Sequence, residues 1–199
     1  MVNNIRRRQL LSGLFALLIM TTVWHWSHAA VIYAKAHLAQ WLIQSAWQTT
    51  LQAGQKTKPW PWADTWPVAK IVFHHQDNNN KQTPFYVLSG STGNSLAFGP
   101  GHDVRTALPA TEGASVIAGH RDTHFSLLHT IQTGSTLEVQ NNKGIWKHYK
   151  VSEQWIADIS TTPFTIDEGK NQLYLVTCYP FNTIAPRGND RLVVRADLM

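Results

Sequence analysis

Cysteine is almost absent from this sequence of 199 residues, which contains Cys178 alone. A single cysteine excludes an intrachain disulfide and a zinc site built from several thiolates. Acidic residues are absent from residues 1–60, which hold six of the 17 Lys and Arg residues, while residues 61–199 hold the other 11 against 12 Asp and Glu. The net charge of +5 therefore belongs to the N-terminal segment, and a nucleic-acid-binding face on the remainder has little support.

Charged residues are also missing between Arg8 and Lys35, an interval of 26 residues that includes the apolar run 10–20. About 20 apolar residues suffice to cross a membrane, and the three arginines before this run predict that the N-terminus lies inside. We therefore expect an uncleaved membrane anchor within residues 1–30. The alternative is a cleaved secretory signal ending near Ala29, where small residues resemble a cleavage site. In both cases the globular part is exported.

Residues 31–67 are expected to connect the anchor to the globular domain. Apolar residues recur among polar neighbours over 31–53, which predicts an amphipathic helix that packs on the domain or lies against the membrane. Its apolar members are Val31, Leu38, Trp41, Leu42, Ala46 and Leu51. Seven of the nine tryptophans fall between Trp24 and Trp66, as is typical of a juxtamembrane stretch. A linker rich in Pro and Trp follows at 58–67.

Short β-prone runs separated by turn residues fill the rest of the chain, without regular helices between them. We expect strands at 69–74, 83–89, 95–98, 114–119, 135–141, 145–157, 172–178 and 191–197. The sequence Asn142-Lys143-Gly144 predicts a turn between two of them. This pattern favours one mainly β domain over residues 68–199, built as a barrel or a sandwich.

Three strand ends carry residues with complementary chemistry. Cys178 ends one apolar run, His120 follows another, and Arg191 begins a third. A thiolate is a nucleophile, an imidazole exchanges its proton, and a guanidinium stabilises an oxyanion. Each residue also has a purely structural interpretation: a buried small side chain for Cys178, a turn cap for His120, and a surface ion pair for Arg191.

The sequence motifs around these residues resemble the three catalytic signatures of sortases, in the same order. They are Ala-Gly-His-Arg-Asp at 118–122 with Phe125, Leu-Val-Thr-Cys-Tyr-Pro at 175–180, and Arg-Leu-Val-Val at 191–194. The run 96–102 is similar to a segment of the small class D-like sortases of Gram-negative (marine) proteobacteria. The resemblance implies an eight-stranded β-barrel with an N-terminal membrane helix and a juxtamembrane amphipathic helix.

The resemblance also implies a cysteine transpeptidase with three catalytic residues. Cys178 is the expected nucleophile, His120 the general acid or base, and Arg191 the oxyanion-stabilising group. Arg191 is preferred to Arg195 and Arg187 because it opens its strand, as the family motif requires. The expected reaction cleaves a Leu-Pro-any-Thr-Gly-like sorting signal through a thioacyl enzyme and transfers the peptide to an amine.

Further expectations concern the binding groove and the partners. Thr177, Tyr179 and Phe181 are predicted substrate-binding residues, and the following loop, with Ile184 and Pro186, is expected to shape the groove. The implied partners are a protein with a C-terminal sorting signal, an amine acceptor and a membrane crossed once, with no nucleic acid, metal or cofactor. The expected location is the bacterial inner membrane, with the catalytic domain on its periplasmic face.

Two other functions fit parts of the sequence. Ten histidines, with His120 and His124 at helical spacing, are compatible with an exported metal-binding module. Its other candidate ligands are His74, His75, His102 and His129. The second alternative is an exported cysteine transpeptidase that acts on peptidoglycan, although such enzymes use a different cysteine motif.

Overall fold

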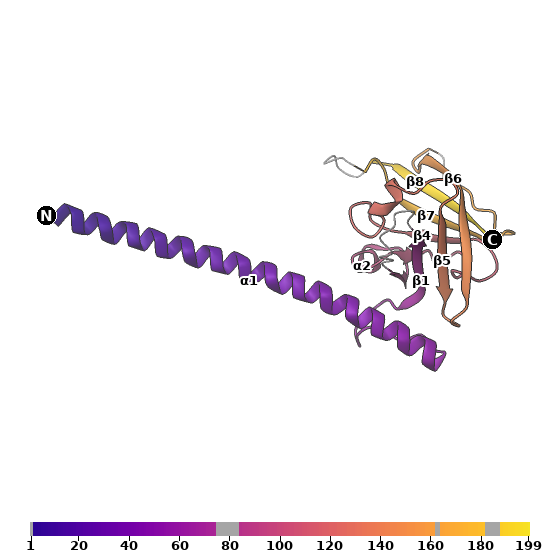
Figure 1. Cartoon of the computed structure of the whole chain (residues 1–199), viewed down its shortest axis with the longest axis horizontal. Helices are drawn as coiled ribbons and strands as arrows, with labels where there is room; N and C mark the ends of the chain where they lie inside the picture. Colours follow the sequence, from indigo (N-terminus) through magenta and orange to yellow (C-terminus); the bar gives the residue numbers. More distant parts are fainter. Residues whose placement is uncertain (1, 75–83, 162–163, 182–187) are drawn as a thin grey trace. The chain divides into compact units, whose positions relative to one another are not determined.

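The computed structural model of the protein describes residues 2–74, 84–161, 164–181 and 188–199. It begins with one unbroken helix, α1 (Val2–Ala53), so the two helices expected at 1–30 and 31–53 are a single helix (Figure 1). No Gly or Pro occurs between Gly13 and Gly54, and the helical hydrogen bonds therefore continue without a break. Gly54 has a φ of +66° and its N–H donates to the Thr50 carbonyl, which ends the helix.

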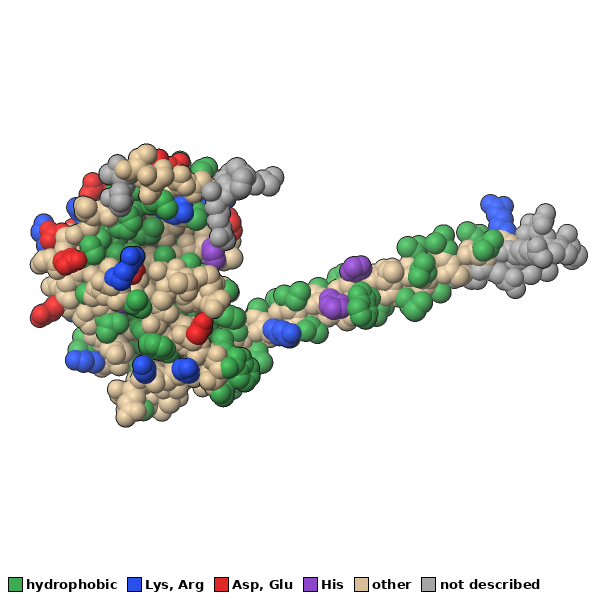
Figure 2. Space-filling model, turned by 180° about the vertical axis from the view of Figure 1, so that it is seen from behind, with side chains coloured by type: hydrophobic (Ala, Val, Ile, Leu, Met, Phe, Trp, Pro, Cys, Tyr) green, Lys and Arg blue, Asp and Glu red, His purple; other side chains and the backbone are tan. Residues whose placement is uncertain are grey.

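The chain divides into two compact units, Met1–Trp41 and Leu42–Met199. In the first unit, apolar side chains are exposed along α1, including Phe15 at 67% and Trp24 at 65% (Figure 2). The segment Gly13–Ala53 has a mean hydropathy of 1.4 in its most apolar window. It is thus long and apolar enough to cross a membrane, as a single-pass anchor must be.

The last turns of α1 belong to the second unit and pack within it. The buried residues of this segment are Ile43, Ala46, Trp47 and Thr50. Their spacing places them on one helix face, and the Nε1 of Trp47 donates to Oε1 of Gln140 at 3.3 Å. The segment therefore packs on the domain, as expected, and Ala46 of the expected apolar face is buried there. Three members of the expected apolar face, Val31, Leu38 and Trp41, are exposed.

Eight strands of the described chain close into a barrel in the order β1-β2-β3-β4-β7-β8-β6-β5, which confirms the expected fold class (Figure 1). They are β1 (Pro67–His74), β2 (Phe85–Ser89), β3 (Gly101–His102), β4 (Ser115–Ala118), β5 (Thr136–Asn141), β6 (Trp146–Asp158), β7 (Gln172–Cys178) and β8 (Asp190–Leu198). A 3₁₀ turn, η1 (Ser126–His129), follows β4. The predicted turn at 142–144 joins β5 to β6, and Thr83 of the expected second strand lies outside the described residues.

The strand expected at 95–98 is wrong. This stretch begins within a one-turn helix, α2 (Gly93–Leu96), and the third strand is β3 instead. The hydroxyl of Ser95 donates to the Gly90 carbonyl at 2.6 Å and holds the turn together. A short apolar run fits a strand and a helical turn equally well, so its composition could not decide between them.

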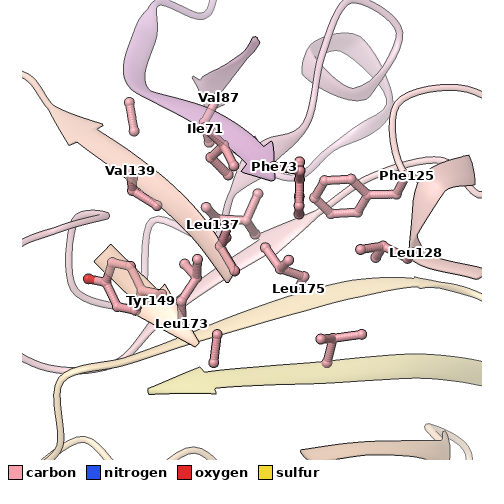
Figure 3. Close-up of a cluster of buried hydrophobic side chains, with 14 of the residues drawn as sticks. Ile71, Phe73, Val87, Phe125, Leu128, Leu137, Val139, Tyr149, Leu173 and Leu175 are labelled. Atoms are coloured by element: carbon pink, nitrogen blue, oxygen red, sulfur yellow. The ribbon is translucent and has the colours of Figure 1, made fainter. Parts of the chain in front are cut away.

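Strand β7 runs through the middle of the hydrophobic packing. Leu173 and Leu175 point into the main core, where they meet residues of β1 and β5 (Figure 3). Tyr174 and Val176 face the other side and belong to a second buried cluster. Because both faces are covered, the strand is apolar at nearly every position rather than at alternate ones.

The pairing around β7 determines which strand ends meet. Strands β4 and β7 are parallel, so both end at the same edge of the barrel. Strand β8 is antiparallel to β7 and therefore begins at that edge. Residues that follow β4, end β7 and begin β8 are thus brought together from distant parts of the sequence.

Candidate active site

Cys178 is the last residue of β7 and is half-buried. In the β7–β8 ladder it lies directly opposite Arg191. Directly opposed residues of an antiparallel pair point to the same face, with Cβ atoms roughly 4.5–5.5 Å apart. The ladder therefore places the thiol-bearing and guanidinium-bearing residues side by side at the barrel edge.

His120 follows the end of β4 and is held next to the end of β7. The N–H of Gly119 donates to the Val176 carbonyl at 3.0 Å, which extends the β4–β7 pairing by one residue. The hydroxyl of Thr177 donates to the Gly119 carbonyl at 2.8 Å. These two bonds bring the imidazole-bearing residue to the level of Cys178, so all three predicted catalytic residues lie at one edge.

Gly119 is required at this point because the chain passes very close to an aromatic ring. A Cβ atom added to Gly119 would lie 2.7 Å from two ring atoms of Phe125. That ring is fully buried in the main core, and the N–H of Phe125 donates to the His120 carbonyl at 3.0 Å. The turn that carries His120 is therefore folded back onto the core.

Arg191 and Arg195 occupy different environments on β8. The Nη1 of Arg191 donates to the carbonyls of Gly188 and Asp190, both at 2.8 Å, at the start of the strand. Arg195 lies opposite Tyr174, away from Cys178, and its side chain forms an ion pair with Glu153 at 3.0 Å. Of these two arginines, only Arg191 is at the edge with the cysteine. The third candidate, Arg187, lies outside the described residues.

The three predicted substrate-binding residues differ in accessibility. Thr177 is 2% exposed and its hydroxyl is bonded to Gly119, so the described geometry gives it a role in joining two strands. Tyr179 and Phe181 are half-buried, pack against the main core, and have ring centroids 6.4 Å apart. A substrate role for all three stays a prediction. Ile184 and Pro186 lie outside the described residues.

A second histidine lies close enough to His120 to be affected by its charge. Burial lowers the pKa of His124, and the charge of His120 lowers it further. The His124 ring also makes an edge contact with Phe85, with centroids 6.4 Å apart. His124 is therefore biased toward the neutral form beside His120. The sequence suggested His124 only as a metal ligand, because its proximity to His120 depends on the turn between them.

Sequence reasoning assigned no role to Arg121, the residue after His120. Its Nη1 donates to the Pro180 carbonyl at 2.6 Å, and only 9% of its side chain is exposed. Its place in the motif was the one signal that could have drawn attention to it.

The candidate metal ligands are dispersed over the barrel. His102 is buried in β3 with its Nε2 facing the Ala107 carbonyl at 2.9 Å, and His74 pairs with Glu138 at 3.1 Å. His75 lies outside the described residues. Within the part of the chain that the structure describes, no three His, Cys, Asp or Glu side chains are arranged to hold a metal ion.

Comparison of the sequence with protein families gives a match to the Sortase domain over residues 79–199. A curated relative, Sortase D of Bacillus subtilis (strain 168), is 29% identical over 98 residues. The match covers 49% of this chain and 50% of that protein, so the chain matches about half of the relative's length.

Solved structures of sortases have the same barrel. A Clostridium perfringens Sortase D5 transpeptidase is similar with a TM-score of 0.60 and 20% identity, over 82% of this chain and 99% of that one. Sortase A from Corynebacterium diphtheriae gives 0.56 and 24%, over 69% and 63%. The catalytic domain of B. anthracis SrtD gives 0.53 and 27%, over 67% and 87%.

Proposed function

Because the chain belongs to the sortase family, we propose that it is a membrane-anchored cysteine transpeptidase that acts on an LPXTG-like sorting signal. One observation carries the proposal: Cys178 lies opposite Arg191 in the β7–β8 ladder, at the edge where β4 delivers His120. Nucleophile, proton-transfer group and oxyanion stabiliser are the three functions that acyl transfer through a thioester requires.

In the first half of the proposed reaction, Cys178 gives up its proton to His120 and its Sγ attacks the carbonyl carbon of the Thr–Gly bond. Arg191 stabilises the negative charge that develops on the carbonyl oxygen. His120 then donates the proton to the leaving nitrogen as the C–N bond breaks. The products are a thioester on Cys178 and the free C-terminal part of the sorting signal.

In the second half, an amine attacks the thioester carbon and His120 accepts the proton that the amine loses. A C–N bond forms, the C–S bond breaks, and the sulfur leaves as the thiolate. His120 then returns the proton to Cys178. Water in place of the amine gives hydrolysis by the same steps.

The proposed membrane attachment rests on α1. Its candidate span, Gly13–Ala53, follows the cluster of three arginines, and such a basic flank favours a cytoplasmic N-terminus. We accordingly assign residues 1–30 to the cytoplasmic stub and anchor, 31–67 to the connection, and 68–199 to the catalytic domain. The catalytic domain then lies on the periplasmic face of the inner membrane.

The test is intact-mass spectrometry of the detergent-solubilised full chain after incubation with an LPXTG peptide. We expect an acyl adduct on Cys178 that Cys178→Ala abolishes. His120→Ala and Arg191→Ala should slow its formation by roughly 100-fold or more, the scale for losing a proton-transfer group or an oxyanion donor. Arg195→Ala is the matched control, because Arg195 lies on the same strand but away from Cys178.

Two outcomes would contradict the proposal. An adduct that persists in Cys178→Ala would show that another group is acylated. An adduct formed with a peptidoglycan stem peptide, but not with the LPXTG peptide, would instead favour the cell-wall transpeptidase.

A further inference from the structure

Arg121 links the chain segment that carries His120 to the segment that carries Cys178. We propose that Arg121 is a positioning residue that fixes the imidazole relative to the thiol, an inference that rests on the proposed transpeptidase function. Its Nη1 donates to the carbonyl of Pro180, two residues after Cys178, at 2.6 Å. Only 9% of the Arg121 side chain is exposed, whereas the acceptor Pro180 lies at an exposed position.

Together with the bonds of Gly119, this bond fixes the chain on both sides of His120 and on both sides of Cys178. On one side, Gly119 is bonded to Val176 at 3.0 Å and to Thr177 at 2.8 Å. On the other side, Arg121 is bonded to Pro180. His120 therefore lies between two anchored neighbours on its own segment.

Cys178 is enclosed in the same way on the other segment. Thr177 before it is bonded to Gly119, and Pro180 after it is bonded to Arg121. Strands β4 and β7 have both ended at this point, so the ladder no longer fixes the separation of the two segments. The Arg121 side chain supplies a connection beyond the end of that ladder.

The proposed positioning role of Arg121 rests on its hydrogen bond to Pro180 rather than on its ion pair with Asp122. Hydrogen bonds from a guanidinium are charge-assisted, and they are shorter and stronger than neutral ones. The neighbouring Asp122 lies 3.5 Å from Nε, but its side chain is 73% exposed, and an ion pair in that position contributes little. Arg191 donates instead to the carbonyls of Gly188 and Asp190, so the two arginines hold different segments.

The chemical consequence follows from the geometry of proton transfer. A general acid or base has to come within about 2.6–3.2 Å of its partner, and a misplacement of about 1 Å can cost roughly 100-fold in rate. Loss of the Arg121 bond to Pro180 removes this connection beyond the ladder, while the bonds of Gly119 to Val176 and Thr177 remain. Arg121→Met should therefore lower kcat for transpeptidation by roughly 10- to 100-fold and leave KM within about twofold.

The decisive test needs no sorting signal. Because Cys178 is the sole cysteine, alkylation of the full chain by iodoacetamide measures the reactivity of this thiol alone. Rates are compared for the parent chain, Arg121→Met, His120→Ala and the double variant. We expect Arg121→Met to slow alkylation by about tenfold in the parent and to have no further effect in the His120→Ala background.

This result would show that Arg121 acts through His120. An equal effect of Arg121→Met in both backgrounds, or no effect in the parent, would overturn the inference. Arg105→Met is the matched control, because Arg105 is 85% exposed and pairs locally with Asp103. Arg121→Lys keeps the charge and a donor, and should restore part of the lost kcat. If Arg121→Met does not fold, as judged by thermal unfolding, the same cycle is run with Arg121→Gln, which removes the charge.

The alkylation cycle separates this inference from the proposed function. A parent chain that forms no peptide adduct would reject the proposed function, even where the cycle shows that Arg121 and His120 act together. If the parent chain forms the adduct but Arg121→Met slows alkylation equally in the parent and in the His120→Ala background, only the role of Arg121 is rejected.

Discussion

Replacement of Gly119 by alanine tests whether the turn that carries His120 is fixed by its contact with the core. The new Cβ would lie 2.7 Å from the Phe125 ring, closer than Cβ atoms approach neighbouring atoms in folded proteins. The ring is fully buried, so it has little free space into which to move. The change should therefore displace the backbone at Gly119, and His120 with it.

The expected cost is that of overpacking a core, about 1–3 kcal/mol. For a protein of this size it corresponds to a fall of about 2–12 °C in melting temperature. Thermal unfolding of the full chain in detergent measures this cost, and peptide thioacylation measures the displacement of His120. Activity should fall even at temperatures where the variant is folded, because Gly119 is bonded to both Val176 and Thr177 beside Cys178.

Gly93→Ala is the control, because no atom lies within 4 Å of the Cβ it would add. It should leave stability unchanged or raise it by up to about 1 kcal/mol. Phe125→Leu provides a second check. It should destabilise the core by itself, but it also removes the ring that the new Cβ would meet, so the double variant should lose less stability than the two single variants lose together. Equal melting temperatures for Gly119→Ala and Gly93→Ala would refute the reasoning.

Two further predictions concern stability. Trp47→Ala should lower the free energy of unfolding by about 3–5 kcal/mol, because the ring is fully buried. Trp62→Ala, at an 82% exposed position, should change it by less than about 0.5 kcal/mol. Equal denaturation midpoints for the two variants would contradict this prediction. Burial lowers the pKa of His102 in the folded protein below its usual value of 6.5. As the pH falls below about 6.5, His102 is therefore protonated more readily in the unfolded chain than in the folded one, and the free energy of unfolding should decrease. Denaturant unfolding at several pH values should show a smaller fall in His102→Gln, and an unchanged fall would exclude His102 as its source.

The parts of the fold that could be predicted from sequence are those that follow from local patterns. The apolar run 172–178 is β7 because a strand covered on both faces is apolar throughout. The three motifs likewise located Cys178, His120 and Arg191, and the strand pairing brings them to one edge.

Features that depend on distant partners were not predictable. In the sequence Trp47 is one of several juxtamembrane tryptophans, but in the structure it is buried and its Nε1 donates to Gln140, 93 positions away. The role inferred for Arg121 depends on Pro180, 59 positions away. The error at 95–98 has a different origin, because a short apolar run there was compatible with two local structures and a serine hydroxyl favours one of them.

The position of β8 in the barrel links the assembly of the site to the completion of folding. This strand is the last of the described strands in chain order and bridges β7 and β6. Its pairing with both neighbours closes the wall of the barrel and places Arg191 opposite Cys178. A nascent chain that lacks β8 consequently has the thiol of Cys178 without the neighbouring guanidinium of Arg191, so the candidate site is complete only once this strand is in place.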